Sequence, residues 1–307
     1  MTGLDRRVRM LGWVLERAAQ RRSGGELQSA RVPDNFFTTF LFGGRRDGVT
    51  VTDTVATGAE GPVPVRIYEP GSKERQRPVV IHFHGGGWVH GSLRLGDWLC
   101  SNVAHDADAI VASVDYRLAP KNPWPAAAAD CYAALVDLSA RLGADDSRLA
   151  VMGDSAGANL AAVTALTSRD RGGPVIAYQA LIYPPTDLTL ASPSMEEFAH
   201  LSTLSKRSFE RMVNNYLQDA DARDPYASPL FATDHHGLPA TLIQVAEYDI
   251  LRDDGLRYAA ALRAAGIEVK STVYQDMPHG YMSFPRLCRS APNALEELSL
   301  SLLAALH

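Results

Sequence analysis

Residues 153–157, with the sequence Gly-Asp-Ser-Ala-Gly, contain the side chain best suited to nucleophilic chemistry in this chain. They directly follow an apolar run that is typical of a buried strand. A sharp strand-to-helix turn exposes a serine hydroxyl in a strained conformation, and glycines two positions away on each side avoid clashes with the neighbouring strand and helix. Ser155 is therefore the candidate nucleophile. A glycine-bounded turn with an N-capping serine has the same pattern, so other residues must decide between a nucleophile and a helix cap.

A second glycine-rich segment lies upstream at residues 84–88 (His-Gly-Gly-Gly-Trp), directly after a strand-like apolar run. Acyl transfer passes through a tetrahedral oxyanion, and each fixed N–H donor at that position is worth roughly 100- to 1,000-fold in rate. We expect Gly86 to be the first donor, with Gly85 or Gly87 beside it and the amide of Ala156 as the third. A phosphate-binding loop is the alternative, but no G-x-x-x-x-G-K-[ST] follows.

The base that activates Ser155 should come later in the chain, because in hydrolases of this architecture the acid and the histidine follow the nucleophile. His279 alone sits in a tight loop after a strand-like stretch, where a base at the end of a strand belongs. We therefore assign it as the base rather than as a surface-loop histidine. The other later histidines lie in polar, helical or terminal segments: His200, His235, His236 and His307.

The acid that orients the base should also follow a strand, and four carboxylates cluster after a strand-like run that precedes Glu247. We select Asp249 and keep Glu247 as the reserve candidate. Asp253 and Asp254 fall where a helix begins, and carboxylates there suit the helix N-terminus without any catalytic role. Asp276 is close to the histidine in sequence but is expected to be a turn residue.

These motifs together resemble those of the hormone-sensitive lipase family of α/β-hydrolase esterases, the bacterial family IV carboxylesterases, in its G-D-S-A-G branch. The resemblance implies a triad of Ser155, Asp249 and His279, with oxyanion donors from the glycine loop and Ala156. It implies a scaffold role for the motif Asp-Tyr-Arg-Leu-Ala-Pro. The resemblance extends from about residue 63 to residue 284 and comprises residues 84–88, 115–120, 153–157, 249–253 and 279–281.

Alternating strand-like and helical segments predict an α/β protein with the α/β-hydrolase fold, a mostly parallel central eight-stranded sheet flanked by helices. A polar stretch with helical spacing interrupts the alternation, so we expect a helical cap insertion at about 186–220 in a catalytic domain of residues 46–307. N-terminal cap helices are expected in residues 1–45. The predicted strands lie near 49–56, 63–69, 78–83, 109–115, 148–153, 175–183, 240–246 and 268–274.

The first stretch of the chain is amphipathic, with apolar side chains at helical spacing in residues 4–15 and arginines largely elsewhere. Such a basic helix can rest on anionic lipid, but the family resemblance favours a cap over the active site. Phe36, Phe37 and Phe40, together with Trp88 of the glycine loop, are expected to bind the substrate.

The composition of the 307 residues argues against several other functions. A net charge of −5 and a pI of about 6.0 give no sign of nucleic-acid binding. Cys100, Cys131 and Cys288 are widely spaced and lack a C-x-x-C pair, so we expect free, packed thiols. His82 and His84 share one side of a strand, but no third ligand accompanies them, so we expect no metal.

The expected reaction is carboxylic ester hydrolysis through an acyl-enzyme, without a cofactor. By analogy with the family, short to medium acyl chains are favoured over long triglycerides, and a homodimer is possible. We expect a cytoplasmic protein without stable membrane insertion, because no secretory signal or membrane-spanning run is convincing. Two alternatives stay open: the same triad acting on an amide, lactone or acetyl ester, and a non-catalytic receptor for a small ligand.

Overall fold

The computed structural model describes residues 42–71, 77–201 and 203–307. Within these ranges, all eight predicted strands are present close to their expected bounds. They are β1 (Val49–Gly58), β2 (Gly61–Pro70), β3 (Val79–Phe83), β4 (Ile110–Val114), β5 (Leu149–Asp154), β6 (Tyr178–Ile182), β7 (Ala240–Tyr248) and β8 (Val269–Pro278).

The strands form one eight-stranded sheet in the order β1-β2-β4-β3-β5-β6-β7-β8. β1 pairs antiparallel with β2, and β2 with β4, whereas every other neighbouring pair is parallel. The central parallel strands are covered on both faces, which explains why β3, β5 and β6 are almost continuously buried. The prediction of a mostly parallel α/β sheet is confirmed.

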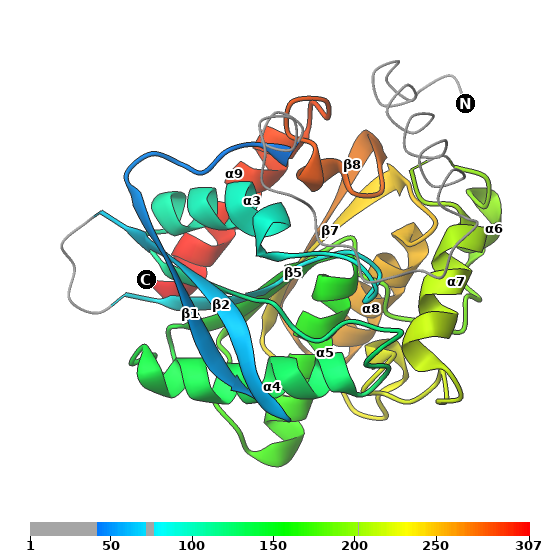
Figure 1. Cartoon of the computed structure of the whole chain (residues 1–307). Coiled ribbons are helices and arrows are strands. Elements are labelled where there is room, and N and C mark those ends of the chain that lie inside the picture. Colours follow the sequence, from blue (N-terminus) through cyan, green and yellow to red (C-terminus); the bar gives the residue numbers. More distant parts are fainter. Residues whose placement is uncertain (1–41, 72–76, 202) are drawn as a thin grey trace.

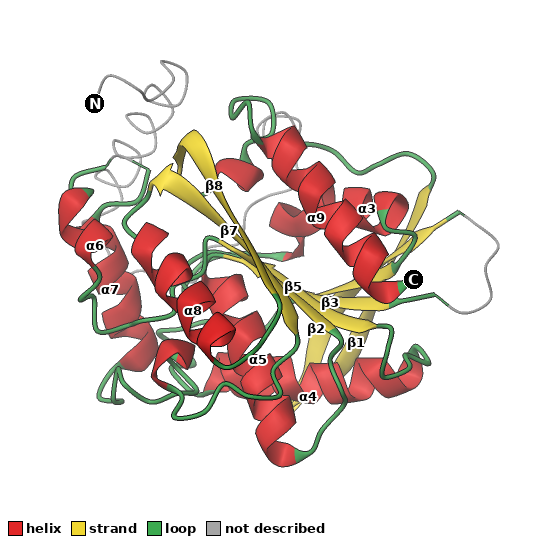
Figure 2. Cartoon of the chain, turned by 180° about the vertical axis from the view of Figure 1, so that it is seen from behind, coloured by secondary structure: helices red, strands yellow, loops and turns green. Residues whose placement is uncertain are grey.

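Helices cover both faces of this sheet (Figures 1 and 2). α3 (Leu93–Asp106) and α9 (Ala291–Leu306) pack on one face, and α4 (Ala126–Arg141), α5 (Ala156–Arg171) and α8 (Arg252–Ala264) pack on the other. Each face buries its own apolar cluster. α5 is buried along most of its length, because its alanines and glycine allow close approach to the sheet.

Two further helices interrupt the alternation between β6 and β7. α6 (Pro193–Glu197) and α7 (Lys206–Leu217) lie within the segment that the sequence marks as an insertion. The buried side of α7 includes Phe209, Val213 and Tyr216, at the helical spacing of an amphipathic helix. Two 3-10 turns complete the described elements: η1 (Pro229–Phe231) and η2 (Tyr281–Ser283).

The parallel direction of β5, β7 and β8 brings their carboxyl ends to one edge of the sheet. Each of these strands is followed immediately by a residue that the sequence selected for chemistry. Ser155 follows β5, Asp249 follows β7 and His279 follows β8. The fold therefore gathers three side chains that are far apart in the sequence.

Residues 1–41 lie outside the described residues, and with them most of the expected N-terminal cap and the candidate pocket residues Phe36, Phe37 and Phe40. The three cysteines are buried thiols, as expected. Nowhere in the described ranges does a helix combine the length and the apolarity that crossing a bilayer requires.

Candidate active site

Ser155 occupies a sharp turn between β5 and α5. Its backbone has φ 54° and ψ −122°, a conformation that residues other than glycine rarely adopt. The turn depends on glycines at both sides: a Cβ on Gly153 would meet the backbone of Gly157, and one on Gly157 would meet the carbonyl oxygen of Phe83 in β3. This is the strained strand-to-helix turn that the glycine spacing predicts.

A chain of hydrogen bonds joins the three selected side chains. Ser155 Oγ lies 2.9 Å from His279 Nε2, and His279 Nδ1 lies 2.7 Å from Asp249 Oδ2. Because an ionised carboxylate can only accept, Nδ1 of His279 carries the proton that bonds to Asp249. Nε2 is therefore free to accept the hydroxyl proton of Ser155. This is the geometry of a nucleophile, its base and an orienting acid.

Asp249 differs from the neighbouring Glu247 in its burial and in its hydrogen-bond partners. Asp249 is fully buried, and its Oδ1 accepts the amide of Leu251 at 2.9 Å. Both carboxylate oxygens are thus hydrogen-bonded, as a buried charge requires. Glu247, the reserve candidate, instead accepts the amide of Asp276 at 2.9 Å. Asp276 has φ 59° but lies within β8, near an irregularity in the pairing of β8 with β7, so it is a strand residue rather than the expected turn residue.

The side chain of His279 is held by aromatic packing as well as by its hydrogen bonds. The ring of Tyr183 meets it edge-on, with centroids 4.7 Å apart, and Tyr281 meets Tyr183 in the same manner at 5.3 Å. Burial raises the pKa of the Tyr183 and Tyr281 hydroxyls, so both stay protonated at neutral pH. Gly280, at φ 78°, provides the turn that follows His279.

The glycine loop lies beside the nucleophile, and its amides are not equivalent. The amide of Gly85 donates to Oδ1 of Asp154 at 3.1 Å, so it is already used. Gly86 and Gly87 have φ of 129° and 61°. Among the described residues, the amides of Gly86, Gly87 and Ala156 have no hydrogen-bond acceptor. Ala156 is also the first residue of α5, where the helix dipole favours negative charge.

His84 holds the glycine loop in place. Its Nδ1 lies 2.9 Å from the carbonyl oxygen of Gly85, and its ring stacks on Tyr116 with centroids 4.4 Å apart. The Tyr116 hydroxyl donates to the carbonyl oxygen of His84 at 2.6 Å. His84 thus orients the glycine loop, and it lies outside the hydrogen-bond chain of Ser155.

His82 is buried in β3, just before the same loop in the chain. Its Nδ1 lies 2.9 Å from Ser113 Oγ and its Nε2 lies 3.7 Å from Asp154 Oδ1. Burial lowers the pKa of His82, which keeps the ring neutral at pH 7. In the part of the chain that the structure describes, no group of three or more His, Cys, Asp or Glu side chains could hold a metal ion.

A cavity of about 250 Å³ opens onto Ser155 and His279. Apart from the glycine loop, Ser155 and His279, the sequence had marked among its wall residues only Leu204 and Met212, which fall within the expected cap segment of about 186–220. The others lie on elements far apart in the chain, and no local motif identifies them. Apolar and aromatic side chains make up most of the described wall: Phe42, Leu95, Trp98, Leu99, Tyr183, Leu204, Met212, Met282 and Phe284.

Trp88 does not line this cavity, contrary to our expectation. The residue is fully buried, and its ring stacks on Tyr216 of α7 with centroids 4.6 Å apart and packs against Phe209. Its backbone has φ 60°, so the turn directs the ring toward α7, where the large apolar surface is removed from water. Trp88 therefore connects the glycine loop to α7.

Comparisons with known proteins agree with this fold. A family model for the alpha/beta hydrolase fold matches residues 80–283. Esterase LipI of Mycobacterium tuberculosis is 41% identical over 264 residues, which cover 84% of this chain and 82% of that protein. An arylesterase of Saccharolobus solfataricus is 37% identical over 232 residues, with 74% and 75% coverage. A solved structure of a Pyrobaculum calidifontis esterase is 33% identical, with a TM-score of 0.86, and covers 99% of this chain and 100% of its own. The chain therefore belongs to the α/β-hydrolase fold family and, within it, to the hormone-sensitive lipase family of carboxylic ester hydrolases.

Proposed function

We propose that this chain is a serine carboxylesterase with Ser155 as the nucleophile, His279 as the general base and Asp249 as the orienting acid. The observation that carries the proposal is the hydrogen-bond chain from Ser155 Oγ through His279 to Asp249 at the edge of a cavity. The nearby amides of Gly86 and Gly87 support it, because an acyl-transfer site needs donors for the oxyanion.

In the first half-reaction, Nε2 of His279 takes the hydroxyl proton of Ser155 as Oγ bonds to the ester carbonyl carbon. The carbonyl electron pair moves onto oxygen, where the loop amides and the amide of Ala156 donate to it. Asp249 stabilises the imidazolium without taking its proton. The imidazolium then protonates the alcohol oxygen as the C–O bond breaks, which leaves an acyl ester on Ser155.

The second half-reaction repeats these steps with water. Nε2 of His279 takes a proton from water as the water oxygen bonds to the acyl carbon, and the same amides hold the second oxyanion. The carbon–oxygen bond to Ser155 then breaks, and its Oγ receives the proton from His279. The carboxylic acid leaves and the resting hydrogen bonds return, so the cycle needs no cofactor.

The preferred substrates are esters with neutral acyl groups of short to medium length. The cavity has a volume of about 250 Å³, and most of its described wall is apolar. The esterases among its relatives support the same class of reaction.

Residues 186–220 are the proposed cap, together with the N-terminal residues 1–45. Support for the first part comes from α7, where Met212 occupies the space that a Cβ on Gly87 would need and Tyr216 stacks on Trp88. The cap thus contacts the glycine loop directly. A cytoplasmic location and a homodimer belong to the same proposal and rest on the sequence and the family resemblance.

The deciding experiment compares purified wild-type protein with Ser155→Ala in the hydrolysis of p-nitrophenyl acetate. Loss of a triad nucleophile should lower kcat on the order of a million-fold. A fluorophosphonate probe should label the wild type and fail to label this variant. Ser283→Ala is the matched control for labelling, because Ser283 lines the same cavity outside the triad. Retention of most activity by Ser155→Ala would remove this serine from the mechanism.

A further inference from the structure

We propose that the ion pair between Arg45 and Asp97 determines substrate size. It holds the segment of residues 42–46 against α3 and thereby fixes the aromatic wall that Phe42 and Trp98 contribute to the substrate cavity. This inference rests on the proposed function, because it concerns the acyl group that reaches the nucleophile. Both members of the pair act through position and take no part in the chemical steps.

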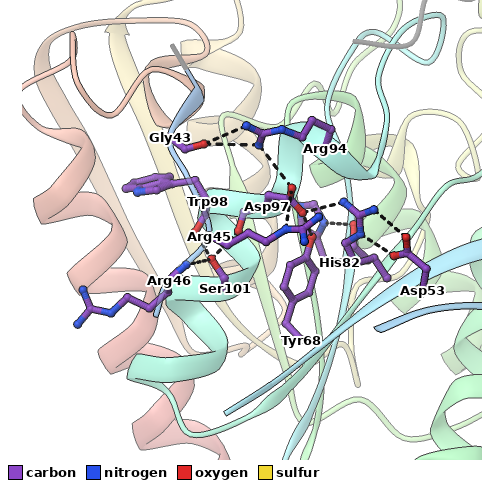
Figure 3. Close-up of polar contacts among 12 residues, drawn as sticks. Gly43, Arg45, Arg46, Asp53, Tyr68, His82, Arg94, Asp97, Trp98 and Ser101 are labelled. Atoms are coloured by element: carbon purple, nitrogen blue, oxygen red, sulfur yellow. Dashed lines mark hydrogen bonds and ion pairs between the residues drawn. The ribbon is translucent and has the colours of Figure 1, made fainter. Parts of the chain in front are cut away.

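Asp97 is the centre of a polar cluster on α3 (Figure 3). Its side chain is 2% exposed. Oδ1 accepts from Arg66 Nη1 at 3.0 Å and from the Tyr68 hydroxyl at 2.7 Å. Oδ2 accepts from Arg45 Nε at 3.1 Å and from Arg94 Nη1 at 3.4 Å. One carboxylate therefore connects β2, α3 and the segment that precedes β1.

Arg45 is not needed to compensate the buried charge of Asp97. Arg66 and Arg94 bring two other guanidinium groups to the same carboxylate, and Arg66 also bonds to Asp53 at 2.6 and 2.8 Å. Loss of the Arg45 side chain therefore leaves the carboxylate of Asp97 paired. Because this side chain is 42% exposed, its removal should also leave the fold intact. The distinct effect of the Arg45 contact is to tether its own segment.

Two other contacts hold the same segment to α3. Arg94 Nη1 and Nη2 donate to the carbonyl oxygen of Gly43 at 3.5 and 3.4 Å. The amide of Arg46 donates to Ser101 Oγ at 2.9 Å. Gly43 lies so close to Trp98 that a Cβ at this position would meet the ring. The segment and the Trp98 ring therefore form one packed unit.

This packed unit is a wall of the cavity. Phe42, Leu95 and Trp98 all line it, and the centroids of the Phe42 and Phe284 rings lie 5.3 Å apart. The three residues of the hydrogen-bond chain instead follow β5, β7 and β8. A loosened segment would therefore widen the cavity without moving the reacting groups.

Two adjacent arginines provide a matched test. Arg45→Ala and Arg46→Ala remove the same charge from neighbouring positions, but only the first breaks the contact with Asp97. The side chain of Arg46 points away from the cluster in Figure 3, and its amide bond to Ser101 survives the substitution. Both variants are compared with wild-type protein on p-nitrophenyl acetate, butyrate and octanoate.

In Arg45→Ala, the ratio of kcat/KM for octanoate to that for acetate should rise about tenfold, roughly the worth of one methylene contact in a pocket. The change should appear in KM for octanoate, with kcat for acetate unaltered. Arg46→Ala should keep the wild-type ratio. In Arg45→Lys, the ammonium can still pair with Asp97, so this ratio should lie close to the wild-type value. Phe42→Ala should raise the ratio as well.

Equal ratios in Arg45→Ala and Arg46→Ala would overturn the inference while leaving the proposed function standing, provided that Ser155→Ala is inactive. Activity retained by Ser155→Ala would overturn the proposed function and this inference with it. Thermal unfolding of each variant shows that the compared proteins are folded, and melting temperatures close to wild type are expected because Arg45 is exposed.

Discussion

The amide of Gly85 donates a hydrogen bond to the carboxylate of Asp154, the residue directly before the proposed nucleophile. A Cβ on Gly85 would meet this carboxylate, so the loop and the β5 terminus are in close contact. The bond uses the amide of Gly85, which leaves those of Gly86 and Gly87 for the proposed oxyanion position. Asp154 thus acts as a positioning residue for the loop, although its own charge suits no step of the reaction.

Replacement of Asp154 by alanine should lower kcat with p-nitrophenyl acetate by about tenfold to a hundredfold. The effect is smaller than the roughly 100- to 1,000-fold expected when a donor is removed outright, because the loop amides remain but are less well held. Asp154→Asn keeps an acceptor for the amide of Gly85 and should stay within a few-fold of wild type. Equal losses in the two variants would mean that the charge, rather than the hydrogen bond, is what matters.

The same carboxylate predicts discrimination against anionic substrates. Among the described residues that line the cavity, Asp154 is the one carboxylate and none is Lys or Arg. Its side chain is 17% exposed, so its charge faces the cavity with limited screening. The p-nitrophenyl monoester of succinate should have a kcat/KM roughly tenfold or more below that of the butyrate ester. Asp154→Asn should narrow this gap, and similar rates for both esters in wild-type protein would contradict the prediction.

Asp249→Asn should lower kcat about 10⁴-fold, because an amide at this position favours the wrong tautomer of His279. The substitution preserves size, so the buried position and the contact with Leu251 remain. Glu247→Gln is the matched control: Glu247 lies two residues away and accepts the amide of Asp276 in β8. Its kcat should match wild type. A large loss in Glu247→Gln with little change in Asp249→Asn would reassign the acid.

The three candidate side chains could be selected from the sequence because each lies in or just after the loop that follows a strand-like run. A parallel core strand is recognisable as an apolar run, and the residue after it lies at the active edge of the sheet. This reasoning selected Ser155, Asp249 and His279, and the structure brings them within hydrogen-bond distance. The signal is local, so it does not depend on how distant segments pack.

The cavity wall could not be derived in this way. Trp98 and Phe284 come from α3 and from the segment after η2, and only the folded chain puts them on one cavity. Trp88 was misassigned for a related reason, because its neighbourhood in sequence is the glycine loop whereas its ring packs on Tyr216 of α7. Similarly, the three consecutive glycines in the sequence did not indicate that the amide of Gly85 donates to the carboxylate of Asp154.

Asp254 is a buried carboxylate in α8 that holds the start of the proposed cap insertion. Its Oδ2 accepts the amides of Thr186 and Asp187 at 3.0 and 3.1 Å, and its Oδ1 contacts the hydroxyl of Ser192. Asp187, whose amide bonds to Asp254, pairs through its own carboxylate with Arg257 at 2.8 Å. Burial raises the pKa of Asp254 from 3.8 to about 7.

Asp254→Asn should therefore change how stability depends on pH. Between about pH 4 and 7 the unfolded chain has lost this proton while the folded protein keeps it, so this group destabilises the wild type as pH rises. An asparagine does not titrate, and its amide can accept the same backbone donors and donate to Ser192. Near pH 4 the free energy of unfolding of the variant should match that of wild type. Between pH 4 and pH 7 it should rise relative to wild type by up to about 1.4 kcal/mol per pH unit. Urea unfolding at several pH values measures this difference. Asp253→Asn, at the neighbouring and less buried position, should show no such trend. A difference in unfolding free energy between Asp254→Asn and wild type that stays constant from pH 4 to pH 7 would disprove the raised pKa of Asp254.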